Sequence, residues 1–158
     1  MSLEPGIVDA NILVYAVDAD APQHSASRAL LDSARAGTAT LYVTSQILCE
    51  FYAVVTNQRR VAKARSSADA FEAISGFVSF LHVLPSPARA VMEWMELRRR
   101  HPVIGAGVFD LQLVATMQAN NIARIYSILI NQRVGDKPST WMARTAFQGT
   151  CGPIPAST

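Results

Sequence analysis

Short segments with strand character alternate along this chain with longer segments of helical spacing, and this alternation constrains the fold more than any other feature. Strands separated by helices are typical of a parallel sheet. We therefore expect an α/β fold in three layers, a parallel sheet flanked by helices on both faces. Strands are predicted at the start of residues 6–17 and in 40–45, 82–85 and 123–130, and helices in the rest of 6–17 and in 23–37, 46–57, 66–81, 86–100 and 108–121.

Residues at the ends of the helical segments support some of these boundaries. Gly37 suits the position just past a helix end, where a left-handed backbone is common. Ser45 can cap the helix of residues 46–57, because a serine oxygen accepts from an unpaired backbone N–H. Ser86 and Pro87 fit the cap and the first residue of the helix that ends in three arginines.

The composition is that of one globular domain, which we expect to span residues 1–158. Half of the residues are hydrophobic and 16% are charged, so the chain is not of the disordered class. A net charge of +2 does not by itself indicate nucleic-acid binding. The two cysteines lack metal-site or disulfide spacing, and the sequence shows no signal peptide or bilayer-length apolar run. We expect a soluble cytoplasmic protein without a membrane partner.

Three acidic residues stand in apolar surroundings. Asp9 interrupts "GIVDANILVYAV", Glu50 is the only charge in "ILCEFYAVV", and Asp110 lies among Phe109 and two leucines. A carboxylate in an apolar setting is costly unless it is paired, hydrogen-bonded or metal-bound. If the three converge, a cation must offset their repulsion, and oxygen-only ligands favour Mg²⁺ or Mn²⁺.

Each acid also has a simpler interpretation when it is taken alone. Asp9 can cap the helix that follows it, as aspartate often does. Asp110 lies in a first helical turn, where the helix dipole favours a negative charge. Glu50 is in the middle of a helix, and an edge helix would expose it. Their joint placement favours a common site. We expect the three acids Asp9, Glu50 and Asp110 to meet at the carboxyl ends of the parallel strands.

Three motifs in order resemble those of the PIN-domain ribonucleases, in particular the bacterial VapC-like toxins. They are "VDANILVYA", "SQILCEFYAVVTN" and "GAGVFDLQLVATMQANNIARIYS", which together run from about Ile7 to Ser127. The resemblance implies that Asp9, Glu50 and Asp110 hold one or two divalent cations and the scissile phosphate of RNA. Asn11 matches a frequent polar companion of the first acid, and Ser127 a serine or threonine at a strand end.

The chain departs from this family pattern after Ser127. The family usually continues with a fourth aspartate, whereas Asn131 and Gln132 stand near its expected place and Asp136 comes too late. The tail from about residue 128 onward is atypical, and both divergence and a shifted reading frame fit it. The resemblance therefore leaves the second metal position open, and activity is expected to be slow.

Two groups of basic residues are candidates for contact with RNA phosphates. Arg59, Arg60 and Lys63 follow the helix that carries Glu50, and Arg99 lies in the arginine run before the helix that carries Asp110. A solvated loop is the simpler explanation of the first group, and arginines at a helix end explain the second group equally well. No base-reading module is recognisable, so the sequence does not indicate which RNA is bound.

The sequence thus predicts a metal-dependent endoribonuclease of the toxin type, with a small antitoxin as partner and a homodimer as the expected assembly. Two other functions fit less well. One is a PIN-fold protein-binding module whose nuclease centre has decayed along with the tail. The other is a haloacid-dehalogenase-like phosphatase with Asp9 as nucleophile, but that scheme expects an acid where Asn11 stands.

Overall fold

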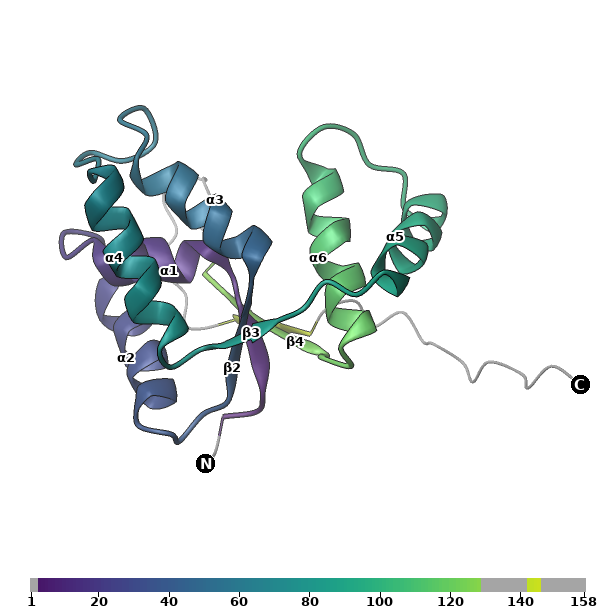
Figure 1. Cartoon of the computed structure of the whole chain (residues 1–158), viewed down its shortest axis with the longest axis horizontal. Coiled ribbons are helices and arrows are strands. Elements are labelled where there is room, and N and C mark those ends of the chain that lie inside the picture. Colours follow the sequence, from purple (N-terminus) through teal and green to yellow (C-terminus); the bar gives the residue numbers. More distant parts are fainter. Residues whose placement is uncertain (1–2, 129–141, 146–158) are drawn as a thin grey trace, which may run out of the picture.

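One five-stranded sheet runs through the centre of the molecule. The computed structural model describes residues 3–128 and the strand at residues 142–145. The order across the sheet is β3-β2-β1-β4-β5, and neighbours among β1 to β4 pair in parallel, as predicted (Figure 1). The strands are β1 (Gly6–Val8), β2 (Leu41–Thr44), β3 (His82–Leu84), β4 (Arg124–Ser127) and β5 (Met142–Thr145).

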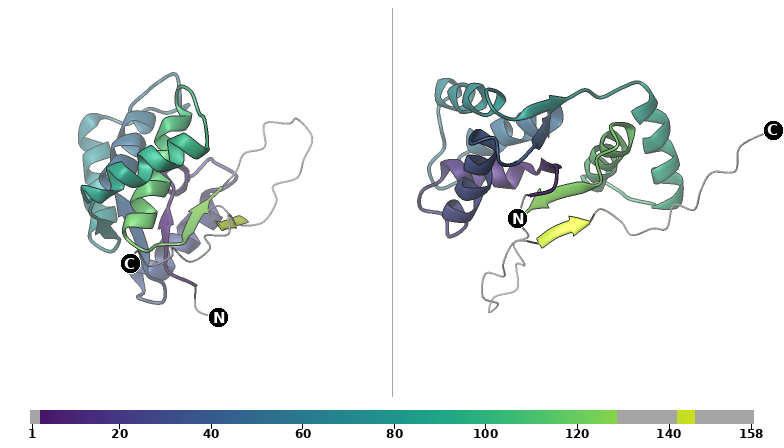
Figure 2. Two further views of the ribbon diagram at one scale, coloured as in Figure 1. Left: turned by 90° about the vertical axis from the view of Figure 1, so that its right-hand side faces the viewer. Right: turned by 90° about the horizontal axis from the view of Figure 1, so that it is seen from below.

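The edge strand β5 was not expected from the sequence. It lies beside β4 and is antiparallel to it (Figure 2). We predicted that the strand of residues 123–130 would be the last one, because the tail shows no clear hydrophobic periodicity. An edge strand that pairs on one side needs no two-sided apolar pattern, which explains why no hydrophobic pattern indicated it.

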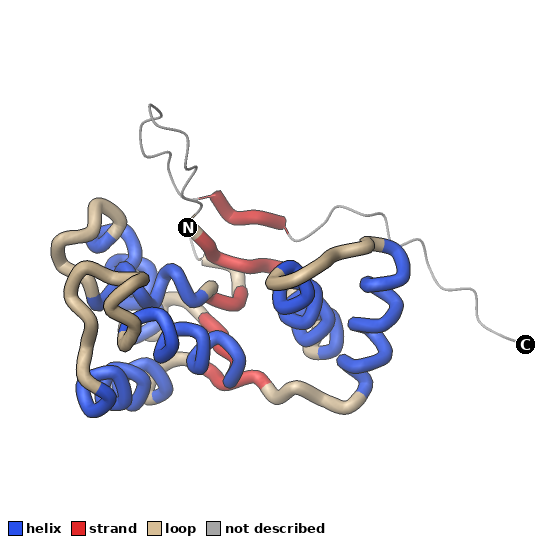
Figure 3. The backbone as a smooth tube through the Cα atoms, turned by 90° about the horizontal axis from the view of Figure 1, so that it is seen from above, coloured by secondary structure: helices blue, strands red, loops and turns tan. Residues whose placement is uncertain are grey.

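Six helices cover the sheet in the part of the chain that the structure describes. They are α1 (Ala10–Val17), α2 (His24–Arg35), α3 (Ser45–Val55), α4 (Ser67–Val78), α5 (Arg89–Arg100) and α6 (Gly107–Ala119). Helices α1 to α4 lie on one side of the strands, and α5 and α6 lie on the other (Figures 1 and 3). This arrangement confirms the predicted three-layer α/β/α fold. None of these helices is long and apolar enough to cross a membrane.

The core forms around β1 and β2, whose side chains are covered on both faces. Ile7 on β1 and Leu41 on β2 are fully buried, and Met117 reaches the same cluster from α6. Phe51 of α3 meets Phe77 of α4 edge to face, with ring centroids 5.3 Å apart. Burying one such aromatic or aliphatic side chain contributes about 1.5–3 kcal/mol, so this cluster fixes the positions of the helices that carry polar groups.

One of the two helix ends next to β2 differs from the sequence prediction by one residue, and the other agrees with it. Thr44, not Ser45, caps α3, because its hydroxyl accepts from the backbone N–H of Ile47 at 3.2 Å. Gly37 does lie past the end of α2 with a φ of +72°, as predicted. The Thr44 cap makes α3 begin directly after β2, so the helix starts at the carboxyl edge of the sheet.

The predicted start of α5 was wrong. Ser86 does not cap this helix, which begins at Arg89. The preceding turn is tighter than an α-helix, because Ala90 N–H donates to the Pro87 carbonyl, three residues back, at 2.8 Å. The Ser86 hydroxyl therefore remains outside the helix.

The order of the strands reverses between β1 and β4. From β1 the chain moves outward to β2 and then β3, and it returns to β4 on the other side of β1. In open parallel sheets, the carboxyl ends of the two strands at such a reversal form the usual place for a functional site. Here β1 is followed directly by Asp9, and β4 ends at Ser127.

Candidate active site

Asp9 lies at the strand-order reversal, and its carboxylate points across to β4. The residue occupies the cap position of α1, yet its side chain makes no capping hydrogen bond. Its Oδ2 instead accepts from the hydroxyl of Ser127 at 2.6 Å, and its backbone N–H donates to the Tyr126 carbonyl at 2.9 Å. The simple capping interpretation of Asp9 is therefore wrong, since its carboxylate serves the junction between β1 and β4.

Asn11 and Ser127 hold this junction together. The Asn11 amide donates to the Ser127 hydroxyl and to the Ile128 carbonyl, both at 3.0 Å, and its oxygen accepts from the Ile128 N–H at 3.3 Å. Ser127 is buried and Asn11 is half-buried. The Ser127 oxygen accepts from Asn11, so its single O–H is left to donate to Asp9. Asn11 therefore fixes the direction of this hydrogen bond.

Glu50 interacts electrostatically with both other acids. The pKa of Glu50 is raised above its ordinary value, first because the carboxyl is partly withdrawn from water and then because Asp9 and Asp110 are negative. The nearby Arg60 opposes this shift and lowers the pKa. The structure thus brings Asp9, Glu50 and Asp110 within electrostatic reach of one another. Glu50 is nevertheless exposed, so the apolar neighbours in its sequence do not bury it.

Asp110 lies in the first turn of α6, as the sequence predicted, and a contact from α3 holds that turn. The amide of Gln46 donates to the carbonyl of Phe109, the residue before Asp110, at 3.2 Å. Gln46 and Glu50 are four residues apart on α3, so they share one face of the helix. Gln46 was not among the predicted site residues, and its spacing from Glu50 was the one signal that could have indicated it.

The donor set fits a hard divalent cation in its chemistry. Three carboxylates that repel one another favour a cation among them, and they offer oxygen ligands alone. In the described part of the chain, no group of three or more His, Cys, Asp or Glu side chains is already arranged to enclose a metal ion. The three acids therefore interact electrostatically, but their side chains do not surround a single point as metal ligands would.

The candidate RNA-binding residues differ in their surroundings. Arg60 lies within electrostatic reach of Glu50, because its positive charge lowers the pKa of that carboxyl. Arg59 is exposed in the same loop. Lys63 forms an ion pair with Asp20 at 2.7 Å, and Arg99 forms one with Glu96 at 2.8 Å. Arg60 is thus the basic residue best placed to meet a phosphate at the acids.

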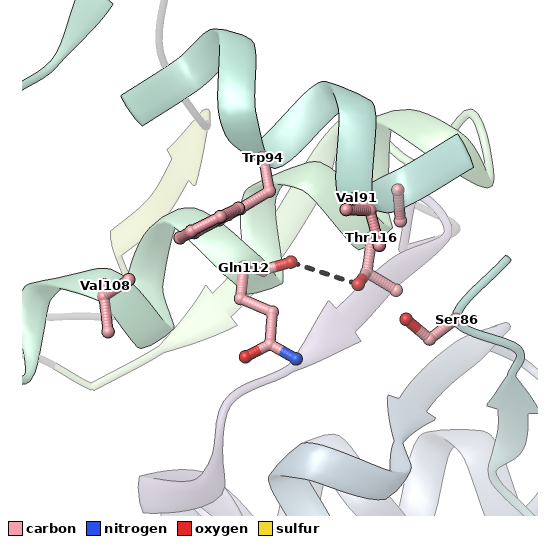
Figure 4. A pocket seen from close by; sticks show the side chains of 7 residues that line it. Ser86, Val91, Trp94, Val108, Gln112 and Thr116 are labelled. Carbon is pink, nitrogen blue, oxygen red and sulfur yellow. Dashed lines mark hydrogen bonds between the residues drawn. The ribbon is translucent and has the colours of Figure 1, made fainter. Parts of the chain in front are cut away.

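A hollow of about 320 Å³ lies elsewhere, between α5 and α6 (Figure 4). Its walls are mostly apolar, and the Thr116 hydroxyl at its side is already used, because it donates to the Gln112 carbonyl at 3.0 Å. Val108 and Gln112 line it from positions two residues before and after Asp110, which places the hollow on the other face of α6. It is lined by Ser86, Ala90, Val91, Trp94, Val108, Gln112 and Thr116.

Comparison with known families and proteins identifies the family to which the chain belongs. The PIN domain family model matches residues 6–127. A VapC ribonuclease of Mycobacterium bovis and ribonuclease VapC43 of Mycobacterium tuberculosis are each 30% identical to the chain over 122 residues, which is 72% of this chain and 79% of each relative. The chain therefore belongs to the PIN domain family, and the resemblance to VapC toxins is confirmed.

Two solved structures share the fold. Mycobacterium tuberculosis VapC20, a sarcin-ricin loop cleaving toxin, is 16% identical with a TM-score of 0.59, and the match covers 79% of this chain and 90% of that one. VapBC2 from Rickettsia felis, solved with a DNA fragment from its promoter, is 20% identical with a TM-score of 0.54, covering 82% and 90%. At these identities the likeness shows the fold alone.

Proposed function

We propose that this chain is a metal-dependent endoribonuclease that hydrolyses RNA phosphodiester bonds. The observation that carries the proposal is the electrostatic coupling of Glu50 to Asp9 and Asp110 at the strand-order reversal. Three acids without a cation among them repel one another, and this is costly for a fold unless the cluster serves a function. The names of the relatives, which are VapC ribonucleases, support the same reaction.

In this proposal each residue has a defined role. Asp9, Glu50 and Asp110 would hold Mg²⁺ or Mn²⁺, which when bound makes water a better nucleophile and offsets charge on the phosphoryl oxygens. Ser127 orients the Asp9 carboxylate through the 2.6 Å hydrogen bond, and Asn11 fixes the Ser127 hydroxyl. Arg60 would pair with an RNA phosphate beside Glu50.

Activity is expected to be slow and to need high metal concentrations. The expected fourth acid is missing, and Asn131 and Gln132, which stand near its place in the sequence, lie outside the described residues. Three acids can still hold Mg²⁺, because this ion keeps several of its waters. We infer that one metal binds firmly and a second weakly.

We further propose that the protein is the toxin of a toxin–antitoxin pair, with a small antitoxin protein as partner, a homodimer as its assembly and the cytoplasm as its location. The likeness to the VapBC2 structure and to the VapC ribonucleases supports this partner. The exposed apolar side chains Met92 and Met95 on α5 offer surface for such a contact.

Single-turnover cleavage of a mixed RNA pool across a Mn²⁺ titration tests the proposed reaction. The wild-type chain should cleave in Mn²⁺ and not in EDTA, and Asp9→Asn should lose roughly a hundredfold or more in rate. Glu72→Gln, an exposed acid on α4, is the matched control and should behave as wild type. Cleavage by Asp9→Asn at the wild-type rate would contradict the proposal. If the wild-type chain cleaves nothing but still binds a small antitoxin, the decayed binding module is the correct function.

A further inference from the structure

Phe109 is an exposed aromatic residue on a stripe of α6 that otherwise faces the core. Leu113 packs against the core and Met117 is fully buried, and both follow Phe109 at intervals of four residues. Side chains at this spacing lie on one face of a helix. Yet 56% of the surface of Phe109 is exposed, so its ring extends this apolar stripe beyond the covered core.

The helical turn that carries this ring lies next to the candidate active site. Asp110 is the following residue, and the Phe109 carbonyl accepts the hydrogen bond from Gln46 of α3. Glu50 is one helical turn beyond Gln46 and is coupled in charge to Asp110. The first turn of α6 thus carries both an exposed aromatic side chain and Asp110, one of the acids that would meet the scissile phosphate.

We propose that Phe109 stacks on an unpaired base of the RNA next to the cleaved bond. This inference rests on the proposed ribonuclease function and deepens it, because it names a side chain of α6 that would hold the substrate beside the cleaved bond. A base in a duplex has its faces covered by its neighbours, whereas an unpaired base can stack on an aromatic side chain. Arg60, which acts electrostatically on Glu50, would hold the RNA backbone on the α3 side while Phe109 holds a base on the α6 side.

Binding of a 12-nucleotide single-stranded RNA containing 2-aminopurine tests this proposal. The full chain is used with Ca²⁺ in place of Mn²⁺, and stacking is read as quenching of 2-aminopurine fluorescence. Phe109→Leu keeps apolar bulk without an aromatic face, and it should weaken binding about tenfold and remove the quenching. Phe109→Tyr should restore both. Phe71→Leu on α4, where the wild-type ring is 67% exposed, is the matched control and should change neither.

Three results would overturn the inference. Phe109→Leu with wild-type binding and quenching would do so, and so would equally tight binding of the same RNA as a duplex. Phe109→Leu that binds RNA normally but loses binding to an antitoxin protein would assign the ring to a protein partner instead. In each of these cases wild-type cleavage of RNA in Mn²⁺ still upholds the proposed function. A wild-type chain that neither binds nor cleaves RNA would overturn both.

Discussion

Replacing Ser127 by alanine should weaken both the fold and metal binding by amounts that follow from its contacts. The Ser127 hydroxyl donates to a carboxylate oxygen of Asp9 at 2.6 Å, and Ser127 is only 7% exposed. A hydrogen bond to a charged group contributes about 1.5–3 kcal/mol. Asp9 is half-buried, so water can replace part of the lost hydrogen bond. We therefore expect the free energy of unfolding to fall by about 1–2 kcal/mol.

The neighbouring amide limits the loss. Asn11 keeps its second bond, to the Ile128 carbonyl at 3.0 Å, so the alanine variant leaves no isolated buried donor. For a chain of 158 residues, a loss of about 1–2 kcal/mol lowers the melting temperature by about 2–8 °C. A residue that hydrogen-bonds a metal ligand and orients it typically contributes about 10–100-fold to metal affinity. Mn²⁺ should therefore bind about 10–100-fold more weakly to Ser127→Ala.

Urea denaturation at pH 7 and calorimetric titration with Mn²⁺ measure the two effects. Ser127→Thr retains the hydroxyl and is the control, which should bind Mn²⁺ within about threefold of wild type. Equal stability and equal Mn²⁺ affinity in Ser127→Ala and wild type would refute the role given to this hydroxyl. A loss of stability without a loss of affinity would show that it supports the fold and not the site.

Further outcomes are expected at other positions. The pKa of Glu50 is raised in the fold, so the stability that its protonated form contributes is lost as the pH rises through that pKa. Glu50→Gln should therefore have a higher urea midpoint than wild type at pH 7, and this difference should vanish below about pH 4. Gln46→Met has the same length without a donor and should lower Mn²⁺ affinity about two- to tenfold at an unchanged melting temperature. Gly6→Ala should cost about 1–3 kcal/mol, because its Cβ would lie 2.8 Å from the Tyr126 ring. Gly76→Ala, a helical position with nothing within 4 Å of the added atom, should instead gain about 0.5–1 kcal/mol in the same urea assay.

The order of elements and the layer arrangement could be predicted because they depend on local patterns. Ile7 and Val8 followed by a helix, and "LYVT" followed by another, have the periodicity of strand and helix within a few residues. Helix ends were less predictable, since Thr44 and Ser45 are both good caps and the backbone decides between them. The pairing of β5 with β4 joins residues distant in sequence, which no local pattern reveals.

The candidate site could be predicted in its members but not in its contacts. Three acids in apolar segments and the family resemblance pointed to Asp9, Glu50 and Asp110. The bonds that hold Asp9, from Ser127 and through Asn11, cross the chain over more than 110 positions and arise only when β1 and β4 pair. The exposure of Glu50 likewise depends on how α3 packs in the fold, which its neighbours in sequence do not indicate.

A crystal soaked in Mn²⁺ and measured at the manganese absorption edge tests the central claim most directly. The account predicts an anomalous peak bounded by the carboxylates of Asp9, Glu50 and Asp110, and no such peak in a crystal of Asp9→Asn soaked in the same way. A wild-type crystal that shows no peak at these three residues, or a peak that persists unchanged in Asp9→Asn, would contradict it.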